Sequence, residues 1–311
     1  MSKMLVFGHQ NPDTDTIASA ISLAYLANQF SEDAEAVALG EANLETKYAL
    51  DYFDYEAPRV IEQASDEVEN VMLVDHNEPQ QSVSDLDKVT IKAVVDHHRI
   101  ANFKTDGPLY YRAEPLGSTA TILTKLYKEY EIPLPKDIAG LMLSALISDT
   151  LLLKSPTTTD EDRKIAEELA ELAGVSLEDY GLEMLKAGTD VANKSATEIL
   201  NDDAKSFKMG KENVRIGQVN VVDINQLLPS RKEELINAMR EEIKEESYDL
   251  LILMITNIIE SNSVAIVEGT AYRSFERAFH KPIQMNTVEL KDVVSRKKQL
   301  VPPLNKIFTA K

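Results

Sequence analysis

The sequence predicts a two-domain α/β protein whose N-terminal domain contains a doubly wound, mainly parallel sheet. In the first half of the 311 residues, short Val- and Leu-rich runs alternate with helical segments, which is typical of buried strands and their connecting helices. In the second half the strands are longer, and this change favours a second, smaller α/β domain. We therefore expect domains over residues 1–188 and 196–311, joined by a linker over 189–195.

The first domain is expected to open with a strand over 3–8 and a helix over 16–29, for which Asp15 is a plausible N-cap. Between them, Pro12 stiffens the loop and should hold Asn11 extended. The later elements are a strand over 34–40, a helix over 44–53, strands that end at Asp75 and Asp96, and helices over 118–130, 137–150 and 160–173.

The second domain is expected to contain four strands and one long charged helix. Arg231 and Lys232 fall in the first turn of that helix, where positive charge faces the helix dipole unfavourably, so we interpret this pair as structural or surface residues. The expected strands cover 206–210, 213–222, 248–257 and 263–269, and the helix covers 230–246.

Composition excludes several classes of function. No stretch of 18 apolar residues exists, so no membrane span is expected, and the N-terminus lacks a cleavable signal pattern, which favours the cytoplasm. The absence of cysteine excludes disulfides, thiolate metal sites and thiol catalysis. A formal net charge of −19 argues against nucleic acid as a partner, because a phosphate backbone requires a basic face.

Four of the five histidines lie in three acidic clusters, and each cluster directly follows an apolar run. The clusters cover 9–15, 75–78 and 96–98. Open α/β sheets gather ligands outside the carboxyl ends of their strands, so the three clusters should converge on one crevice. Imidazole and carboxylate groups without cysteine suit divalent metal ions, and the number of carboxylates indicates more than one ion.

The first cluster places His9, Asp13 and Asp15 on a strand-to-helix turn, where the two carboxylates could point at neighbouring ions. The alternative is that Asp13 or Asp15 caps the helix and that His9 is a surface histidine. Asp75 could bridge both ions, although an isolated aspartate at a strand end is also common in ordinary turns.

The third cluster is harder to explain by packing, because His97 and His98 directly follow a buried strand and Asp96. Asp149 lies at the C-terminal end of a helix, where a negative charge opposes the dipole and requires a compensating cation. Two ions about 3.5–4 Å apart can share a bridging water and lower its pKa to about 7. The clusters therefore indicate a two-metal hydrolase that cleaves a phosphate ester or anhydride in line.

Basic residues in the second half are candidates for anion binding. Arg296 and Lys297 lie in the segment SRKKQ, and Lys205 follows the expected linker. A short basic segment is often a solvated surface turn, but a phosphate substrate in an acidic protein requires local positive charge, which Arg and Lys provide.

The motifs GHQNPDTD, VDHNE, DHH, SDT and SRKKQ together closely resemble the family II inorganic pyrophosphatases, the manganese-dependent branch of the DHH phosphoesterase superfamily. The resemblance covers essentially the whole chain. It implies hydrolysis of inorganic pyrophosphate to two phosphates by a metal-bridging hydroxide in the interdomain cleft. It also implies two Mn²⁺ or Co²⁺ ions per subunit, Mg²⁺ that enters with the substrate, and a homodimer joined through the N-terminal domain.

The resemblance further assigns roles to individual residues. Asp75 bridges the two metals, His98 contacts the phosphate under attack, and Asp96 and His76 support the ligands from outside. One metal is held by His9, Asp13 and Asp75, and the other by Asp15, Asp75, His97 and Asp149. The diphosphate oxygens are bound by His98, Lys205, Arg296 and Lys297.

Two other functions compete with this hypothesis. A DHH phosphoesterase acting on nucleotides, or an exopolyphosphatase, would use the same metals, but such relatives carry a Gly-Gly-Gly-His motif and this chain contains no Gly-Gly pair. A metal-binding regulatory protein without catalysis would require a broken ligand set, whereas every expected ligand is present. Only twenty residues separate Asp75 from Asp96, so we expect no nucleotide-binding regulatory insertion.

Overall fold

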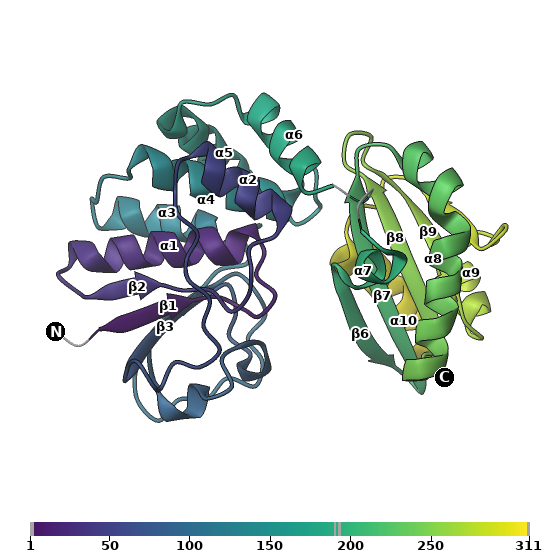
Figure 1. The fold of residues 1–311 in the computed structure, drawn as a ribbon, viewed down its shortest axis with the longest axis horizontal. Coiled ribbons are helices and arrows are strands. Elements are labelled where there is room, and N and C mark those ends of the chain that lie inside the picture. The colour runs from purple at the N-terminus through teal and green to yellow at the C-terminus, as the bar shows by residue number, and fades with distance from the viewer. Residues whose placement is uncertain (1–2, 190, 192–193, 310–311) are drawn as a thin grey trace. The chain divides into compact units, whose positions relative to one another are not determined.

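The computed structural model describes residues 3–189, 191 and 194–309, and the chain divides into two compact units, Met1–Gly188 and Thr189–Lys311. Each unit is built on its own five-stranded sheet, and the first sheet is parallel throughout (Figure 1). The predicted α/β fold class, with a parallel sheet in the first unit and a second sheet in the other, is therefore confirmed. Part of the expected linker over 189–195 lies outside the described residues.

The sheet of the first unit has the strand order β2-β1-β3-β4-β5. Strand β1 lies inside the sheet, between β2 and β3, and is the fully buried run MLVF, as the apolar sequence predicts. The edge strand β5 was not predicted, because its sequence YYRA is only partly buried and lacks an apolar run. The strands are β1 (Met4–Phe7), β2 (Ala34–Ala36), β3 (Asn70–Val74), β4 (Thr90–Asp96) and β5 (Tyr110–Ala113).

Helices gather on one side of this sheet, where α1 packs against β1, β2 and β3 (Figure 1). Helix α1 begins at Thr14, and its N-cap is Asp13 rather than Asp15 as predicted, because the Asp13 carboxylate accepts the N–H of Thr16. The helices of this unit are α1 (Thr14–Gln29), α2 (Leu44–Tyr52), α3 (Thr119–Glu129), α4 (Lys136–Thr150), α5 (Asp160–Ala173) and α6 (Leu177–Ala187).

The other side of the sheet is covered by non-helical chain and two 3₁₀ turns, η1 (Pro79–Gln81) and η2 (Leu86–Lys88). Ile61 and Val68 from this covering segment pack in one cluster with Phe7 and Leu73 of the sheet. The segment is anchored by the buried carboxylate of Asp85, which accepts the backbone N–H groups of residues 64 and 65 at 2.8–3.2 Å. One carboxylate thus satisfies two backbone donors of a segment that lacks regular secondary structure.

The second unit has the strand order β10-β9-β8-β7-β6, in which only β7 and β8 are parallel. Helices α7 and α8 pack on one face and α9 and α10 on the other. The strands are β6 (Ala204–Met209), β7 (Glu212–Val221), β8 (Leu250–Asn257), β9 (Asn262–Glu268) and β10 (Thr287–Leu290). The helices are α7 (Ala196–Asn201), α8 (Ile224–Glu246), α9 (Tyr272–Phe279) and α10 (Val301–Thr309).

The predicted position of Arg231 in the first turn of its helix was wrong, because α8 begins at Ile224 and continues through Pro229. Proline suggested a helix start, yet here the helix tolerates the missing N–H within its second turn. Arg231 is therefore not in the first turn, and its guanidinium instead donates to the Val191 carbonyl and pairs with Glu234. Among the described residues, no helix is both long and apolar enough to cross a bilayer.

We predict that Asp85→Ala destabilises the protein by about 1–3 kcal/mol, because two backbone N–H groups lose their acceptor in a buried position. Urea unfolding at neutral pH measures this loss. Asp87→Ala, an exposed carboxylate in the adjacent η2 turn, is the matched control and should leave stability unchanged.

The same pair of variants should respond differently to pH. Burial alone would raise the pKa of Asp85, but hydrogen bonds from Ser65 and Ala64 hold it below its ordinary value. The carboxylate therefore stabilises the fold above its unfolded pKa of about 3.9, and this contribution is lost as the pH falls through the lower folded value. A stability difference between wild type and Asp85→Ala that persists unchanged at pH 2–3 would contradict this account.

Candidate metal centre

The three predicted clusters meet at one edge of the first sheet. Strands β1, β3 and β4 are neighbours and run parallel, so their carboxyl ends lie side by side. Each strand is followed directly by candidate ligands, and the start of α1 and the last turn of α4 supply the others. Seven predicted residues are brought together in this way, and they are His9, Asp13, Asp15, Asp75, His97, His98 and Asp149.

Asp75 lies between the two halves of the cluster and is almost fully buried. Its Oδ2 atom is 3.6 Å from Nε2 of His9, and its Oδ1 atom is 3.5 Å from Nε2 of His97. Two threonine hydroxyls orient the carboxylate, because Thr16 donates to Oδ2 at 2.8 Å and Thr119 donates to Oδ1 at 3.0 Å. Oδ2 of Asp75 therefore faces His9, whereas Oδ1 faces His97 and also lies 3.6 Å from Nδ1 of His98. A carboxylate whose two oxygens face different histidines in this way can bridge two ions.

The first candidate metal group consists of His9, Asp13 and Asp75. The Asp13 Oδ2 atom lies 3.5 Å from His9 Nε2, while its Oδ1 atom accepts the N–H of Thr16 at 2.9 Å. The two interpretations of this turn are thus compatible, because one oxygen caps the helix and the other remains directed at His9. Burial would raise the pKa of Asp13, but attraction to His9 and the hydrogen bonds lower it below its ordinary value.

The second group consists of Asp15, Asp75, His97 and Asp149, whose potential ligand atoms all lie within 4.8 Å of one another. His97 Nε2 is 3.4 Å from Oδ2 of Asp149. His97 Nδ1 is 3.0 Å from the Leu116 carbonyl, so Nδ1 carries the proton and the lone pair of Nε2 faces the carboxylates. Nε2 is buried and forms no hydrogen bond among the described residues.

This arrangement fits divalent cations. Burial and the surrounding carboxylates raise the pKa values of Asp75 and Asp149 well above their ordinary range. Burial also lowers the pKa of His97, so its ring is neutral near pH 7. An imidazole lone pair and carboxylate oxygens that face one another at 3.4–3.6 Å repel each other unless a cation lies between them. Nitrogen and oxygen donors of this kind suit manganese and similar ions.

The N-terminus of α3 compensates part of this negative charge. The backbone N–H of Thr119 donates to Asp15 Oδ2 at 2.7 Å, and that of Ala120 donates to Oδ1 at 3.2 Å. A helix N-terminus carries partial positive charge and is a natural partner for a carboxylate. Sequence analysis did not identify Thr16 or Thr119, and the only available signal was the capping sequence Ser118-Thr119 at the start of α3.

Several residues in or next to the cluster have a left-handed backbone conformation. Asn11 has φ of 54° and Asp75 has φ of 57°, so the prediction that Pro12 holds Asn11 extended was wrong. Asparagine tolerates this left-handed region better than most residues. After α4, the run Leu151–Leu153 also has positive φ at all three positions, and it begins two residues after Asp149. Strained conformations of this kind are typical of functional sites.

His98 is held by the fully buried carboxylate of Asp96. Asp96 Oδ1 accepts the His98 backbone N–H at 3.0 Å and lies 2.9 Å from its Nδ1, and Oδ2 accepts from Asn77 at 2.6 Å. Burial would raise the pKa of Asp96, but His98 and Asn77 keep it at about 2. The second nitrogen of His98 is thereby left for another partner. His76 is buried, and burial lowers its pKa to about 4.

The predicted anion-binding residues lie in the second unit. Lys205 and Lys297 are exposed, whereas Arg296 is buried, which the sequence did not suggest. The Arg296 guanidinium donates to the Asp203 carbonyl and carboxylate, both at 2.6 Å, and to the Ile216 carbonyl at 3.2 Å. Ile216 is the cross-strand partner of Lys205, so Arg296 and Lys205 are associated with the same part of the sheet.

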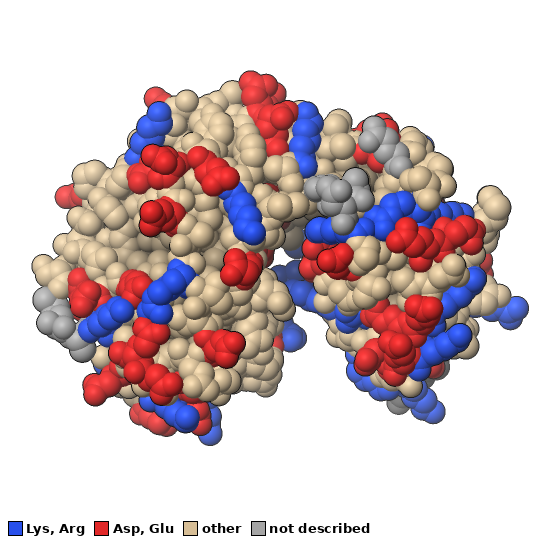
Figure 2. All heavy atoms as spheres, viewed as in Figure 1, with Lys and Arg blue, Asp and Glu red and all other residues tan. Residues whose placement is uncertain are grey.

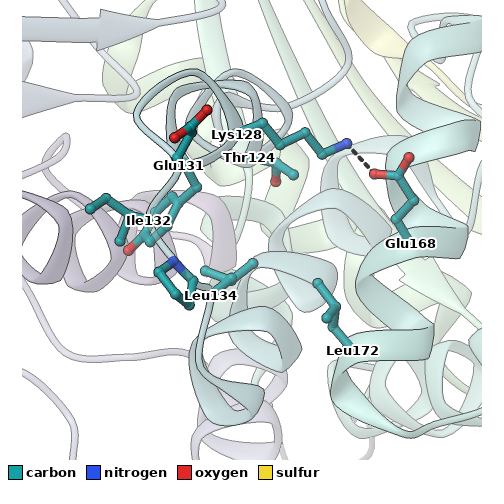
Figure 3. Close-up of a pocket in the computed structure, with 9 residues that line it drawn as sticks. Thr124, Lys128, Glu131, Ile132, Leu134, Glu168 and Leu172 are labelled. Atoms are coloured by element: carbon teal, nitrogen blue, oxygen red, sulfur yellow. Dashed lines mark hydrogen bonds and ion pairs between the residues drawn. The ribbon is translucent and has the colours of Figure 1, made fainter.

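A separate pocket of about 290 Å³ lies between the end of α3, the following loop and α5 (Figure 3). Its walls are largely apolar, and an ion pair between Lys128 and Glu168 spans its rim. None of the candidate metal ligands lines this pocket.

Comparison with known proteins agrees with this architecture. Residues 3–146 match the N-terminal domain of the DHH family, and residues 182–307 match the DHHA2 domain. The parallel sheet with Asp and His clusters at its strand ends, followed by a DHHA2 unit, thus defines a protein of the DHH class.

Full-length relatives define the family more narrowly. The chain is 58% identical over 312 residues to a Lactobacillus gasseri protein named "probable manganese-dependent inorganic pyrophosphatase", and all of both chains is covered. It is 55% identical to the manganese-dependent inorganic pyrophosphatase of Bacillus subtilis, with 98% of each chain covered. The chain belongs to the family of manganese-dependent inorganic pyrophosphatases, also called family II.

Solved structures give the same fold. A Methanococcus jannaschii crystal structure assigned to the family II inorganic pyrophosphatases matches with a TM-score of 0.83 and 42% identity, covering 99% of this chain and all of that one. An exopolyphosphatase-related protein from Bacteroides fragilis matches with a TM-score of 0.51 and 12% identity, covering 99% of this chain and 92% of that one, which indicates a shared fold only.

We predict that Asp75→Asn lowers the affinity for Mn²⁺ by at least about 100-fold, because it removes charge from both metal groups at once. Metal content after desalting, measured by mass spectrometry, tests this prediction. Asp85→Asn, another buried aspartate outside the cluster, is the control and should retain wild-type metal content. Two tightly bound ions in the Asp75→Asn variant would show that this carboxylate is not a bridging ligand.

Proposed function

We propose that this protein hydrolyses inorganic pyrophosphate to two phosphates. The observation that carries this proposal is the position of Asp75, whose two oxygens face two separate groups of candidate metal ligands. Full-length relatives with 55–58% identity that are named manganese-dependent inorganic pyrophosphatases support the same activity.

The proposed cofactors are two Mn²⁺ or Co²⁺ ions per subunit, with Mg²⁺ entering together with pyrophosphate. The donor set supports this choice, because it combines imidazole nitrogen with carboxylate oxygen and contains no sulfur. When bound, a pair of such ions supplies a water activated near neutral pH and neutralises phosphoryl oxygens.

The side chains would then have distinct roles. Asp75 holds the two metal groups at a constant separation, because both of its oxygens are fixed by threonine hydroxyls. His98 contacts the phosphate under attack, and Asp96 fixes the orientation of its ring. The diphosphate oxygens are bound by Lys205, Arg296 and Lys297 together with His98.

Binding from the second unit would require the units to come together around the substrate. We propose that residues of both units complete the active site and that the linker near Gly188 is the hinge. We also propose a cytoplasmic homodimer joined through the first unit. The edge strand β5, with its exposed Tyr110, supports such an association, because an unpaired strand edge can pair with another chain.

We predict that kcat/KM for pyrophosphate exceeds that for polyphosphate, dinucleotides and adenosine bisphosphates by several decades. Four cationic or imidazole groups and the metals would use all the diphosphate oxygens, which leaves no place for a nucleoside. The chain contains no tryptophan to stack a base, and its charge of −19 repels a long phosphate chain. Phosphate release from each substrate with Mn²⁺ present provides the measurement, and comparable hydrolysis of any nucleotide would favour a general DHH phosphoesterase instead.

We predict that Lys297→Ala and Arg296→Lys each lower kcat/KM for pyrophosphate by about 10- to 100-fold without loss of metal. Lys297→Ala removes a charge-assisted contact to substrate, and Arg296→Lys removes the planar guanidinium that can bind two phosphate oxygens at once. Arg296→Lys is chosen over alanine because Arg296 also binds two carbonyl groups of its own unit. Lys291→Ala, an exposed lysine elsewhere in the second unit, serves as control. Unchanged kinetics in both test variants would remove the SRKKQ segment from the active site.

A further inference from the structure

A carboxylate outside the candidate ligand set connects both flanks of the metal centre. Glu45 lies in the first turn of α2, and its Oε1 atom accepts a hydrogen bond from the Thr14 hydroxyl at 2.9 Å and another from the Ser148 hydroxyl. The three residues are 31 and 103 positions apart in the sequence. One oxygen atom therefore joins the start of α1 to the last turn of α4.

The two hydroxyl donors are immediate neighbours of candidate metal ligands. Thr14 lies between Asp13 and Asp15, and Ser148 directly precedes Asp149. Asp13 and Asp15 belong to different metal groups, and Asp149 shares a group with Asp15. Any shift of Thr14 relative to Ser148 would therefore change the distance between ligands of the same ion.

Glu45 forms no ion pair among the described residues, so its charge has no cationic partner there. Burial is the main cause that raises its pKa to about 6, and the nearby charge of Asp13 raises it further. An uncompensated, partly buried carboxylate is costly, and one that accepts two hydroxyl groups beside metal ligands is readily explained by a positioning role.

The opposite side of Glu45 faces Gly188, the last residue of the first unit. A Cβ atom at position 188 would lie 3.0 Å from Cβ and 3.1 Å from Oε2 of Glu45. Gly188 has φ of −72°, which any residue adopts, so the backbone itself does not require glycine. The lack of space beside Glu45 is the constraint at this position.

We propose that Glu45 is a positioning residue that sets the spacing between the α1 and α4 ligands, and that a side chain at residue 188 would displace Glu45 from this position. This inference rests on metal binding by the cluster and is independent of the substrate. The resulting geometry also links the point where the chain leaves the first unit to the ligands of both metal groups.

Titration of the metal-free protein with Mn²⁺ by calorimetry tests the role of Glu45. Glu45→Ala should weaken Mn²⁺ binding by about 10- to 100-fold, as is typical when an orienting partner of a ligand is lost. Glu45→Gln should retain more affinity, because its amide oxygen can still accept a hydrogen bond from one hydroxyl. Asp51→Asn, an exposed carboxylate on the same helix, should match wild type.

The outcomes distinguish this inference from the proposed function. No Mn²⁺ binding by the wild type would overturn the metal centre itself. Wild-type affinity in Glu45→Ala would overturn only the positioning role. Thermal unfolding of each metal-free variant identifies a purely structural effect. Such an effect would lower the melting temperature and leave the Mn²⁺ affinity of the folded protein unchanged. This result would also overturn the positioning role.

Gly188→Ala provides an independent test, because it should crowd Glu45 and lower Mn²⁺ affinity without changing any ligand. Gly107→Ala is the control, since a Cβ there meets nothing within 4 Å. In a Glu45→Ala background the effect of Gly188→Ala should shrink, because the contact with Oε2 no longer exists. Equal effects of Gly188→Ala in both backgrounds would show that the two positions act separately.

Discussion

The repulsion among carboxylates around Asp75 is the constraint on which the first unit depends. Asp13, Asp15, Asp75 and Asp149 converge on two histidines, and a fold that gathers them must offset their charge. The protein uses the N-terminus of α3, several hydroxyl groups and a strand order that brings three strand ends together. These partners reduce the repulsion only in part, and the proposed divalent cations would complete the compensation. The need to offset the charge of these carboxylates therefore connects metal binding with the architecture of the sheet.

Charge is also divided between the two units. Residues 1–188 contain 15 Lys and Arg and 34 Asp and Glu, whereas residues 189–311 contain 18 of each, so the whole net charge of −19 belongs to the first unit. Figure 2 shows acidic side chains interspersed with basic ones on the viewed face of both. An acidic unit concentrates cations, and a neutral unit can present lysine and arginine to an anion without long-range repulsion. This division of charge suits a reaction that needs bound metal cations and an anionic substrate.

The sequence predicted the parts of the structure that depend on local patterns. Apolar runs located β1, β3 and β4, and the polar residues behind them located the cluster. What could not be predicted depends on contacts between distant segments. The cap of α1 is Asp13 because Asp15 is occupied by α3, and Arg296 is buried because Asp203 and Ile216 bind it. Nothing in the pattern around Glu45 indicates that its partners lie in two other helices.

The left-handed turn Leu151–Leu153 constrains how this protein can change in length. Its backbone N–H groups return to the end of α4, and the Leu152 side chain occupies the space beside Gly181 in α6, where a Cβ would meet it at 2.4 Å. Surface connections between helices usually accept insertions and deletions. Here one added or removed residue would shift the register of the turn and move Asp149, so homologous chains are expected to vary in length at other connections and to keep this one constant.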